Sequence, residues 1–341
     1  MKWAVTVLAG VLLAWLGWQV FNWAVLKAVF QPDLLACQSL DHAGACWGVV
    51  AEKFRPMVLG AYPHEAQWRP LTALALTGAF ACVAFGSVWA PRGWRLSSRA
   101  AWFLGLCWLL GSLGLMRGGF AGLESVPVSQ WGGLPLTLVL AVASLVLSLP
   151  LGILLALGRR SPHAGLSLPC TVFIETVRGV PLVTLLFMAA FMLPALFPAD
   201  AQPSLFGRVL ATLSLFSAAY LAELVRAGLQ TVPAEQVEAA QVLGLTGWRI
   251  QLKVVLPQAL RAVLPALVSH TIGLLKDTSL VMVVSLHELT GSLGLALGGD
   301  ADWRPFYFEG YLFIAAIYAL MCLGLARLGR RIEAGWQQAV R

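Results

Sequence analysis

Six charged side chains interrupt long apolar segments of the chain, where ionisable groups are costly and usually have a function. Glu175 and Arg178 are three residues apart, as are Glu223 and Arg226, so each pair shares a helix face and can neutralise itself. Near the end of an apolar segment, such pairs can reach the membrane interface or lock neighbouring helices together. The functional alternative is a gate at the mouth of a pathway through the membrane.

Lys276 and Asp277, the other two charges, lie deeper. About fourteen residues separate them from the start of their segment near Ala262, which places them roughly 21 Å into the membrane at the rise of an α-helix. Adjacent opposite charges at that depth need partners or a polar cavity. A zwitterionic amino acid offers complementary ammonium and carboxylate groups, and a helix break at Thr278 and Ser279 would expose backbone dipoles to it. A purely structural pairing of the two charges is the open alternative.

A polar stretch interrupts the apolar sequence at residues 231–262, TVPAEQVEAAQVLGLTGWRIQLKVVLPQALRA. Pro233 suits a first helical position, and Glu235 and Glu238 lie where the positive end of a helix favours carboxylates. Gly244 suits a left-handed stop, after which a second helix begins. The stretch therefore predicts a compact helix-turn-helix between membrane spans.

The residues around these groups are overwhelmingly apolar, at 59% of the 341 residues, and only 11% of the chain is charged. Such a composition is typical of an integral membrane protein. Runs of roughly twenty apolar residues, enough to cross about 30 Å of hydrocarbon, predict transmembrane helices. The lack of period-two alternation favours an all-α bundle over a barrel. The eight predicted spans are 3–26, 72–90, 100–116, 134–157, 168–197, 206–226, 262–286 and 310–328.

The cations of the sequence orient these spans. The net charge of +7 arises from short loops and the C-terminus, which argues against nucleic-acid binding. All four basic clusters fall on one side of an eight-span chain, and the positive-inside rule makes that side cytoplasmic, so both termini are predicted inside. The clusters are Arg92, Arg95 and Arg99; Arg159 and Arg160; Arg249, Lys253 and Arg261; and Arg327, Arg330 and Arg331.

A glycine-rich segment at 117–133 divides the chain into two predicted domains. Residues 1–130 form a three-span extension with a periplasmic loop at 27–71. Residues 131–341 form a five-span core that contains the cytoplasmic helix-turn-helix, 231–261.

Cys37 and Cys46 lie in the outer loop, where oxidising surroundings would allow a disulfide. The other four of the six cysteines suit small apolar fillers. The five histidines show no metal-ligand spacing, so no metal site is predicted.

The spacing within the polar stretch is Glu238-Ala239-Ala240, three residues, Gly244, nine residues, then Val254-x-Leu256-Pro257. It resembles the "EAA" loop of bacterial ABC-importer permeases, with Val254 where isoleucine is usual. A polar loop with two interfacial helices is the simpler alternative, but it does not account for the spacing. The resemblance implies a helix that docks in a groove of an ATPase and transmits a rigid movement. The residues implied in coupling are Glu238, Ala239, Ala240, Gly244, Leu256 and Pro257.

Four further strings of the core resemble the polar amino acid permeases, the family of histidine, glutamine and general amino acid uptake systems. In order, they are WGGLPLTL at 131–138, ExxRGxPL at 175–182, AYxAExxRxGL at 219–229 and KDTSL at 276–280. The three-span extension resembles the larger "M" subunit of general L-amino acid systems. The implied fold is a type I importer permease with a five-helix core.

The resemblance implies the permease subunit of an ATP-driven, binding-protein-dependent importer of polar or general L-amino acids in a bacterial inner membrane. The implied partners are an ATP-binding cassette ATPase dimer, a second, homologous permease chain, a periplasmic amino acid binding protein and membrane lipid. The sequence has no Gly-x4-Gly-Lys-Ser/Thr phosphate loop, so ATP and Mg are expected on the ATPase. The chain itself is expected to bind no cofactor and to catalyse no reaction.

Two other classes of function fit the sequence less well. A stand-alone secondary transporter should have matching halves, and the division into three and five spans shows none. A membrane enzyme needs a dyad, a triad or a metal cluster, and His270, within a predicted span, has no such neighbours in the sequence.

Overall fold

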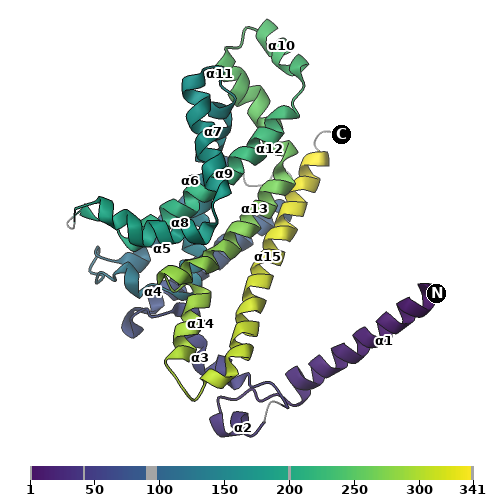
Figure 1. The fold of residues 1–341 in the computed structure, drawn as a ribbon, viewed down its shortest axis with the longest axis vertical. Helices are drawn as coiled ribbons and strands as arrows, with labels where there is room; N and C mark the ends of the chain where they lie inside the picture. Colours follow the sequence, from purple (N-terminus) through teal and green to yellow (C-terminus); the bar gives the residue numbers. More distant parts are fainter. Residues whose placement is uncertain (1, 41–42, 90–97, 199–200, 339–341) are drawn as a thin grey trace.

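The computed structural model describes residues 2–40, 43–89, 98–198 and 201–338, and this part of the chain is helical without a β-strand. The α-helices are α1 (Lys2–Phe21), α2 (Leu34–Gln38), α3 (Gly48–Leu59), α4 (Trp68–Trp89), α5 (Ser98–Arg117), α6 (Gly133–Arg159), α7 (Ala164–Gly179), α8 (Leu182–Phe187), α9 (Leu205–Gln230), α10 (Ala234–Val242), α11 (Gly247–Ile250), α12 (Leu256–Ala262), α13 (Leu264–Asp277), α14 (Leu289–Gly298) and α15 (Tyr307–Gln338). They form an elongated bundle with α10 and α11 at one end and α2 and α3 at the other (Figure 1). We call these the Gly244 end and the Cys37 end.

Five helical segments of the described residues are long and apolar enough to cross a membrane, against the eight spans expected. The span expected at 168–197 is not one helix, because it bends by 104° between α7 and the segment Leu182–Leu196. Pro181 explains the bend, since proline cannot donate a backbone hydrogen bond and forces the residue before it out of the helical conformation. The five segments are Val5–Leu26, Gly133–Arg159, Leu205–Gln230, Leu264–Val284 and Arg304–Gly335.

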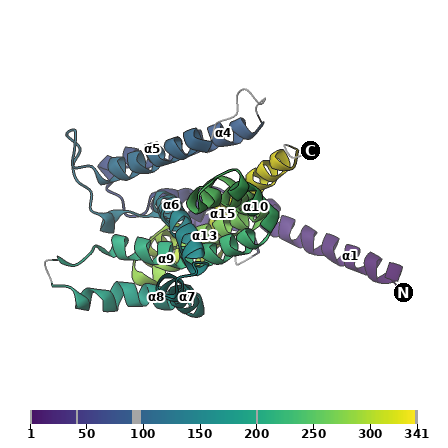
Figure 2. The same cartoon turned by 90° about the horizontal axis from the view of Figure 1, so that it is seen from above.

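Counting the bent pair as one span gives up to six spans in the described part of the chain. The other two expected spans, 72–90 and 100–116, coincide with α4 and α5, which lie side by side at the edge of the bundle (Figure 2). The structure therefore supports a multi-span helical protein but does not establish eight spans.

The centre of the bundle is the long contact between α6 and α9. Gly152 allows this close approach, because a side chain there would collide with Ala218 and Leu221 on α9. Leu140 on α6 and Leu213 on α9 are fully buried beside this contact. The two helices form the frame from which the charged residues near the Gly244 end project.

At the Cys37 end, α3 and the loop before it pack against α14 and the start of α15. A disulfide joins Cys37 to Cys46, whose Cα atoms are 5.4 Å apart. The Lys53 ammonium lies 2.6 Å from the Asp300 carboxylate and holds the pKa of Asp300 below its usual value. These contacts attach α3 and the disulfide-closed loop to α14, α15 and the connection between them.

Removing the disulfide should loosen this attachment without unfolding the core. For Cys46→Ser we expect a loss of about 2.5 kcal/mol in the stability of the outer loop, because the bond closes a loop of about ten residues in the unfolded chain. Maleimide labelling of Cys37, with and without reductant, measures the bond, and thermal unfolding measures the loss. Cys107→Ser, which removes a free cysteine, is the control. Equal labelling of Cys37 and Cys46 with and without reductant would show that no disulfide forms.

The first helix, α1, extends away from the bundle in both views (Figures 1 and 2). The candidate span Val5–Leu26, which overlaps α1, has no residues buried inside the protein in its apolar window, and Trp15 and Trp18 are exposed. Its C-terminal continuation is anchored, since Ala45 donates its N–H to Trp23 O and Trp47 donates its indole N–H to Ala24 O. A helix that is apolar all round must be covered by lipid or by another membrane chain.

Candidate functional site

A cluster of five charged side chains lies near the Gly244 end, where α6, α7 and α9 meet. Glu223 on α9 is its centre: it accepts hydrogen bonds from Arg159 at 2.5 Å and from Arg226 at 3.0 Å, and Arg178 lies 3.9 Å away. Arg159 also pairs with Glu175, at 2.8 Å. Three guanidinium groups thus face two carboxylates, and the Glu223 side chain is only 16% exposed.

Glu223 and Arg226 come together as the sequence predicts, but Glu175 reaches Arg159 on α6 instead of Arg178 on its own helix. The cause is tertiary, because α7 packs against both α6 and α9. Arg159, which the sequence places among the loop cations, is therefore a member of this cluster. The sequence feature that indicates this role is the position of Arg159 as the last residue of a long apolar helix, where a cation also interacts favourably with the helix dipole.

A line of polar and aromatic side chains leads from this cluster toward the middle of the bundle. The Arg178 guanidinium lies 5.4 Å from the ring centre of Tyr220, and Tyr220 stacks on His270 of α13. His270 shares a 2.8 Å hydrogen bond with the Ser217 hydroxyl, which donates to the Ser148 hydroxyl at 3.0 Å. Hydrogen bonding thus connects α6, α9 and α13 at a depth where unpaired polar groups would be costly.

The predicted deep pair, Lys276 and Asp277, lies at the end of α13. Lys276 is exposed and Asp277 is half-buried, and no ion pair among the described residues joins the two. The α-helix ends at Asp277, and a 3-10 helix, Thr278–Val284, follows it. Thr278 is buried and donates its hydroxyl to the Leu275 carbonyl oxygen at 2.7 Å, while Ser279 is half-buried.

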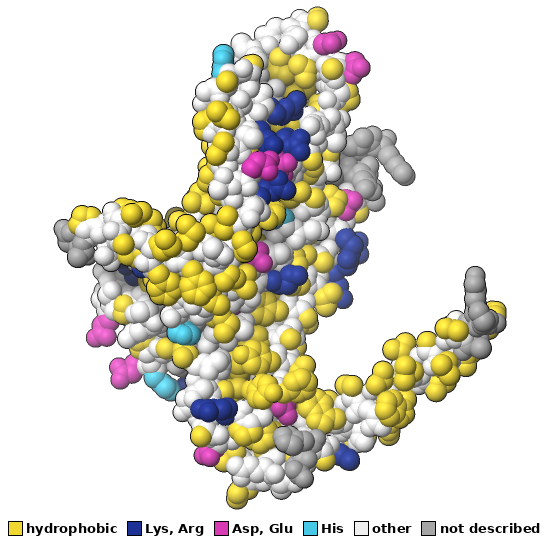
Figure 3. Space-filling view, in the orientation of Figure 1, with side chains coloured by type: hydrophobic (Ala, Val, Ile, Leu, Met, Phe, Trp, Pro, Cys, Tyr) yellow, Lys and Arg dark blue, Asp and Glu magenta, His cyan; other side chains and the backbone are white. Residues whose placement is uncertain are grey.

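His270 and Asp277 are seven residues apart, close to two helical turns, so they share one face of α13. Figure 3 shows charged side chains of both signs gathered near the Gly244 end, and further charges continue along the bundle below them. The structure thus connects the charges of α7 and α9 to His270 on α13, and Asp277 lies about two turns further along the same face of α13.

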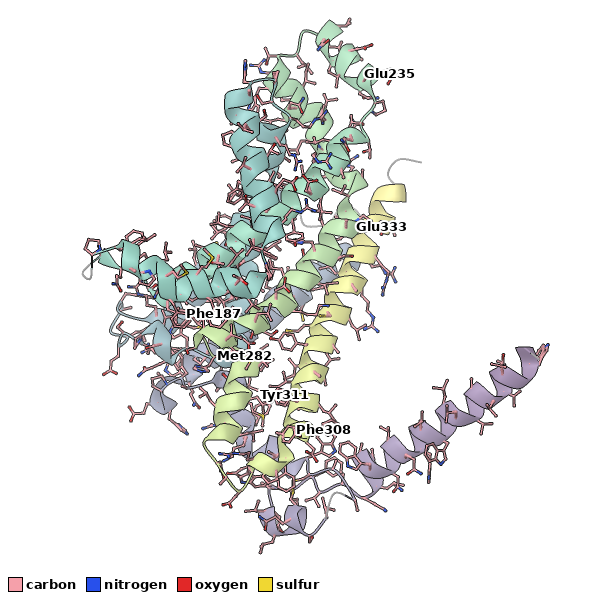
Figure 4. All side chains as sticks on the ribbon, viewed as in Figure 1. Phe187, Glu235, Met282, Phe308, Tyr311 and Glu333 are labelled. Atoms are coloured by element: carbon pink, nitrogen blue, oxygen red, sulfur yellow. A yellow bond between two sulfur atoms is a disulfide. The ribbon has the colours of Figure 1, made fainter. Side chains whose placement is uncertain are left out.

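The polar stretch forms the helix-turn-helix that the sequence predicts. Pro233 precedes α10 as its N-cap, and Gly244 has a φ of +76°, in the left-handed region. Gly244 donates its N–H to Gln241 O and Leu245 donates its N–H to Ala240 O, which is the hydrogen-bond pattern of a Schellman stop. The α10–α11 turn is the tip of the molecule, and Glu235 on α10 marks it in Figure 4.

The tip has a buried base and an exposed outer surface. Ala240 is buried, whereas Glu238 and Ala239 are exposed. Leu256 begins α12 and is half-buried, and Pro257 after it is exposed. The apolar side chains exposed on the tip are Val242, Leu243, Trp248 and Leu252.

A hydrophobic cluster ties this tip to the membrane helices. Ala240 packs with Ile250 and Val255 of the second helical segment, and these reach Ala222 and Leu229 on α9 through the same buried cluster. Such a packed connection moves as a unit, because close-packed interiors transmit displacement. A force applied at the α10–α11 turn would therefore reach α9, the helix that carries Glu223.

Glu288 is a buried carboxylate that the sequence pattern did not single out. It is fully buried and accepts hydrogen bonds from the Tyr318 hydroxyl at 2.7 Å and from the backbone N–H groups of Thr290 and Gly291. Thr137 on α6 donates a further hydrogen bond at 3.3 Å. Glu288 therefore caps α14 and joins it to α6 and α15. Its position immediately before an apolar helix was the available signal.

Comparisons with known proteins agree with this architecture. The family described as "Binding-protein-dependent transport system inner membrane component" matches residues 148–338. The inner membrane amino-acid ABC transporter permease protein YhdY of Escherichia coli (strain K12) is 40% identical over 323 residues, covering 94% of this chain and 86% of that protein. The glutamate/glutamine/aspartate/asparagine transport system permease protein BztC of Rhodobacter capsulatus is 33% identical over 389 residues, covering 97% of this chain and 89% of that protein.

A solved structure also matches. The crystal structure of an amino acid ABC transporter with histidines is 32% identical, with a TM-score of 0.53, over 59% of this chain and 91% of that chain. The solved structure thus corresponds to little more than half of the present chain, whereas YhdY and BztC match nearly all of it.

Proposed function

The chain belongs to the family of binding-protein-dependent transport system inner membrane components, and we propose that it is the permease subunit of an ATP-driven importer of polar or general L-amino acids. Its fold is that of a type I ABC-importer permease in the inner membrane. The observation that carries the proposal is the Gly244 helix-turn-helix, exposed at the tip and packed onto α9 at its base. The alternative of a stand-alone secondary transporter gives no reason for such a tip.

The proposed assembly has four kinds of component. An ATPase dimer binds ATP and Mg and meets the tip, a second and homologous permease chain completes the pathway, and a periplasmic binding protein delivers the amino acid. Membrane lipid surrounds the spans, and this chain binds no cofactor. In the proposed topology both termini are cytoplasmic, and α4 and α5 add the two spans that complete eight. The apolar, side-by-side packing of α4 and α5 supports this count.

In the proposed coupling step, the α10–α11 turn lies in a groove of the ATPase. The exposed residues Glu238 and Ala239 contact that groove, while Ala240 and Leu256 hold the turn to the membrane helices. Closure of the ATPase dimer on ATP then moves the turn, and the movement reaches α9 through the buried cluster. The charge cluster around Glu223 lies on that route, which suits a gate.

The proposed pathway follows the polar line from the Glu223 cluster to Asp277. Asp277 lacks an ion-pair partner among the described residues, which favours contact with the ammonium group of a passing amino acid over a purely structural role. The α-helix ends at this residue and continues as a 3-10 helix, so the backbone geometry changes beside the Asp277 carboxylate.

Asp277→Asn should reduce amino acid uptake or change its selectivity by about 1–3 kcal/mol, which is roughly fivefold to 150-fold, because a charge partner of the cargo is lost. The measurement is uptake by the reconstituted complex with ATP and binding protein, in competition with other amino acids, sugars and peptides. Glu175→Gln should change selectivity less, and Asp302→Asn, in the exposed α14–α15 connection, is the neutral control. If the Asp277→Asn transporter kept the wild-type uptake rate and selectivity, the role of Asp277 would be purely structural. Competition by sugars alone would overturn the substrate class, and uptake without ATP would contradict the importer assignment.

A further inference from the structure

A small pocket lies at the Cys37 end, between the disulfide-closed loop and the first turn of α15. Its volume is about 300 Å³. Trp23 and Phe308 pack against each other in its wall, with ring centres 5.6 Å apart, and Figure 4 shows Phe308 where the α1 segment meets the lower end of α15. The lining residues used here are Trp23, Cys37, Phe306, Tyr307, Phe308 and Glu309.

The Glu309 carboxylate of this pocket is buried and has no cationic partner. Its side chain accepts the backbone N–H of Cys46 at 3.1 Å, and the residue is 7% exposed. None of the ion pairs among the described residues includes it. Two cations at this end have other partners, since Lys53 pairs with Asp300 and Arg304 donates to the last carbonyl of α14. A buried carboxylate without a counter-ion is costly, so an external cation would be stabilised here.

The walls of the pocket favour an organic cation. Aromatic faces attract ammonium groups, and a carboxylate adds a charge-assisted hydrogen bond. The pocket therefore selects an ammonium group on a slender stem over a hydrated metal ion, for which the described residues offer no cluster of three ligands.

The location of the pocket indicates the source of that ammonium group. The candidate span Val5–Leu26 ends beside Trp23, and the candidate span Arg304–Gly335 begins beside Glu309, so the pocket lies where two spans leave the hydrocarbon. Lipid headgroups occupy this depth, which is also where tryptophan and tyrosine concentrate. From this point α1 and α15 diverge (Figure 1), and both expose apolar side chains that acyl chains could cover.

We propose that this pocket binds the ammonium headgroup of an aminophospholipid, with Glu309 as its counter-ion and Trp23 and Phe308 as its aromatic walls. The lipid would fill the junction between α1, the disulfide loop and α15, which protein side chains leave open. This role is independent of the cargo and of the ATPase.

Native mass spectrometry of the intact purified transporter tests the proposal with phosphatidylethanolamine and phosphatidylglycerol of the same acyl chains. We expect the wild type to retain phosphatidylethanolamine roughly tenfold better than phosphatidylglycerol. Glu309→Gln, which keeps an acceptor for the Cys46 amide, should abolish the preference, and Trp23→Leu should reduce it several-fold. Glu52→Gln, an exposed glutamate on α3, should leave it unchanged. An intact Cys37–Cys46 disulfide in each variant shows that the loop has folded.

Three results would overturn the proposal. One is equal retention of the two lipids by the wild type, and another is an unchanged preference in both Glu309→Gln and Trp23→Leu. The third is displacement of the lipid by low concentrations of soluble ethanolamine, because the natural ligand would then be a free amine rather than a lipid.

Discussion

Replacing Glu223 by glutamine should abolish most uptake and destabilise the transporter. Glu223 lies among Arg159, Arg178 and Arg226, and its side chain is mostly shielded from solvent. Glutamine keeps the shape but removes the charge, so three guanidinium groups would face Glu175 alone. Breaking a buried ion pair by removing one partner costs about 3 kcal/mol, which is enough to open the junction of α6, α7 and α9.

The matched control for this change is Glu175→Gln. Glu175 is 55% exposed and forms an ion pair with Arg159, so its loss should cost under about 1 kcal/mol. Thermal unfolding of the purified complex and uptake in proteoliposomes measure both variants. Combining Glu223→Gln with Arg159→Gln should recover part of the lost stability, since one uncompensated charge is removed. If Glu223→Gln and Glu175→Gln lowered thermal stability and uptake equally, Glu223 would not be the central residue of the cluster.

Replacing Gly244 by valine should separate ATP hydrolysis from transport. Gly244 has a φ of +76°, and left-handed backbone costs a side-chain-bearing residue about 1–2 kcal/mol, with more for a β-branched one. The expected effect is not steric, because no atom lies within 4 Å of a Cβ placed at this position. The turn would adopt another conformation and change the direction of α10. Uptake per ATP hydrolysed should therefore fall by roughly tenfold, while membrane insertion is unchanged.

Two further variants isolate the backbone effect. Gly247→Val places the same side chain three residues away, also in open space but without a left-handed φ, and should couple normally. Gly244→Asn should retain most coupling, because asparagine tolerates the left-handed region. Uptake and ATPase activity are measured in the same proteoliposomes. A Gly244→Val transporter with the wild-type ratio of uptake to ATP hydrolysis would refute the coupling assignment.

The features that the sequence predicted well are those determined by local chemistry. The stop at Gly244 follows from one glycine after a helix. At Thr278 and Ser279 the expected break is only a change from α-helix to 3-10 helix within one continuous span. A run of apolar residues likewise predicts a helix such as α6 without knowledge of its neighbours. Each of these needs only a few consecutive residues.

The features that it missed depend on contacts between distant residues. Glu175 has an arginine three residues away, but the packing of α7 on α6 offers Arg159 instead. Glu288 lies in the connection before α14, and it is buried only because α6 and α15 pack against it. The sequence shows the proline that causes the bend at Pro181. The size of the bend depends on how α8 packs against α9, so it could not be predicted from the length of the apolar run.

The contact between Cys46 and Glu309 also determines the order in which the protein can be assembled. The two residues are 263 positions apart, so the disulfide loop is made long before the helix on which it rests. At a synthesis rate of about 5–20 residues per second, the loop waits roughly 13–50 s for Glu309 to appear. During that interval Cys37 and Cys46 have no Glu309 against which to dock. A disulfide formed in that time would close the loop first, and α15 would then pack against a loop of fixed shape.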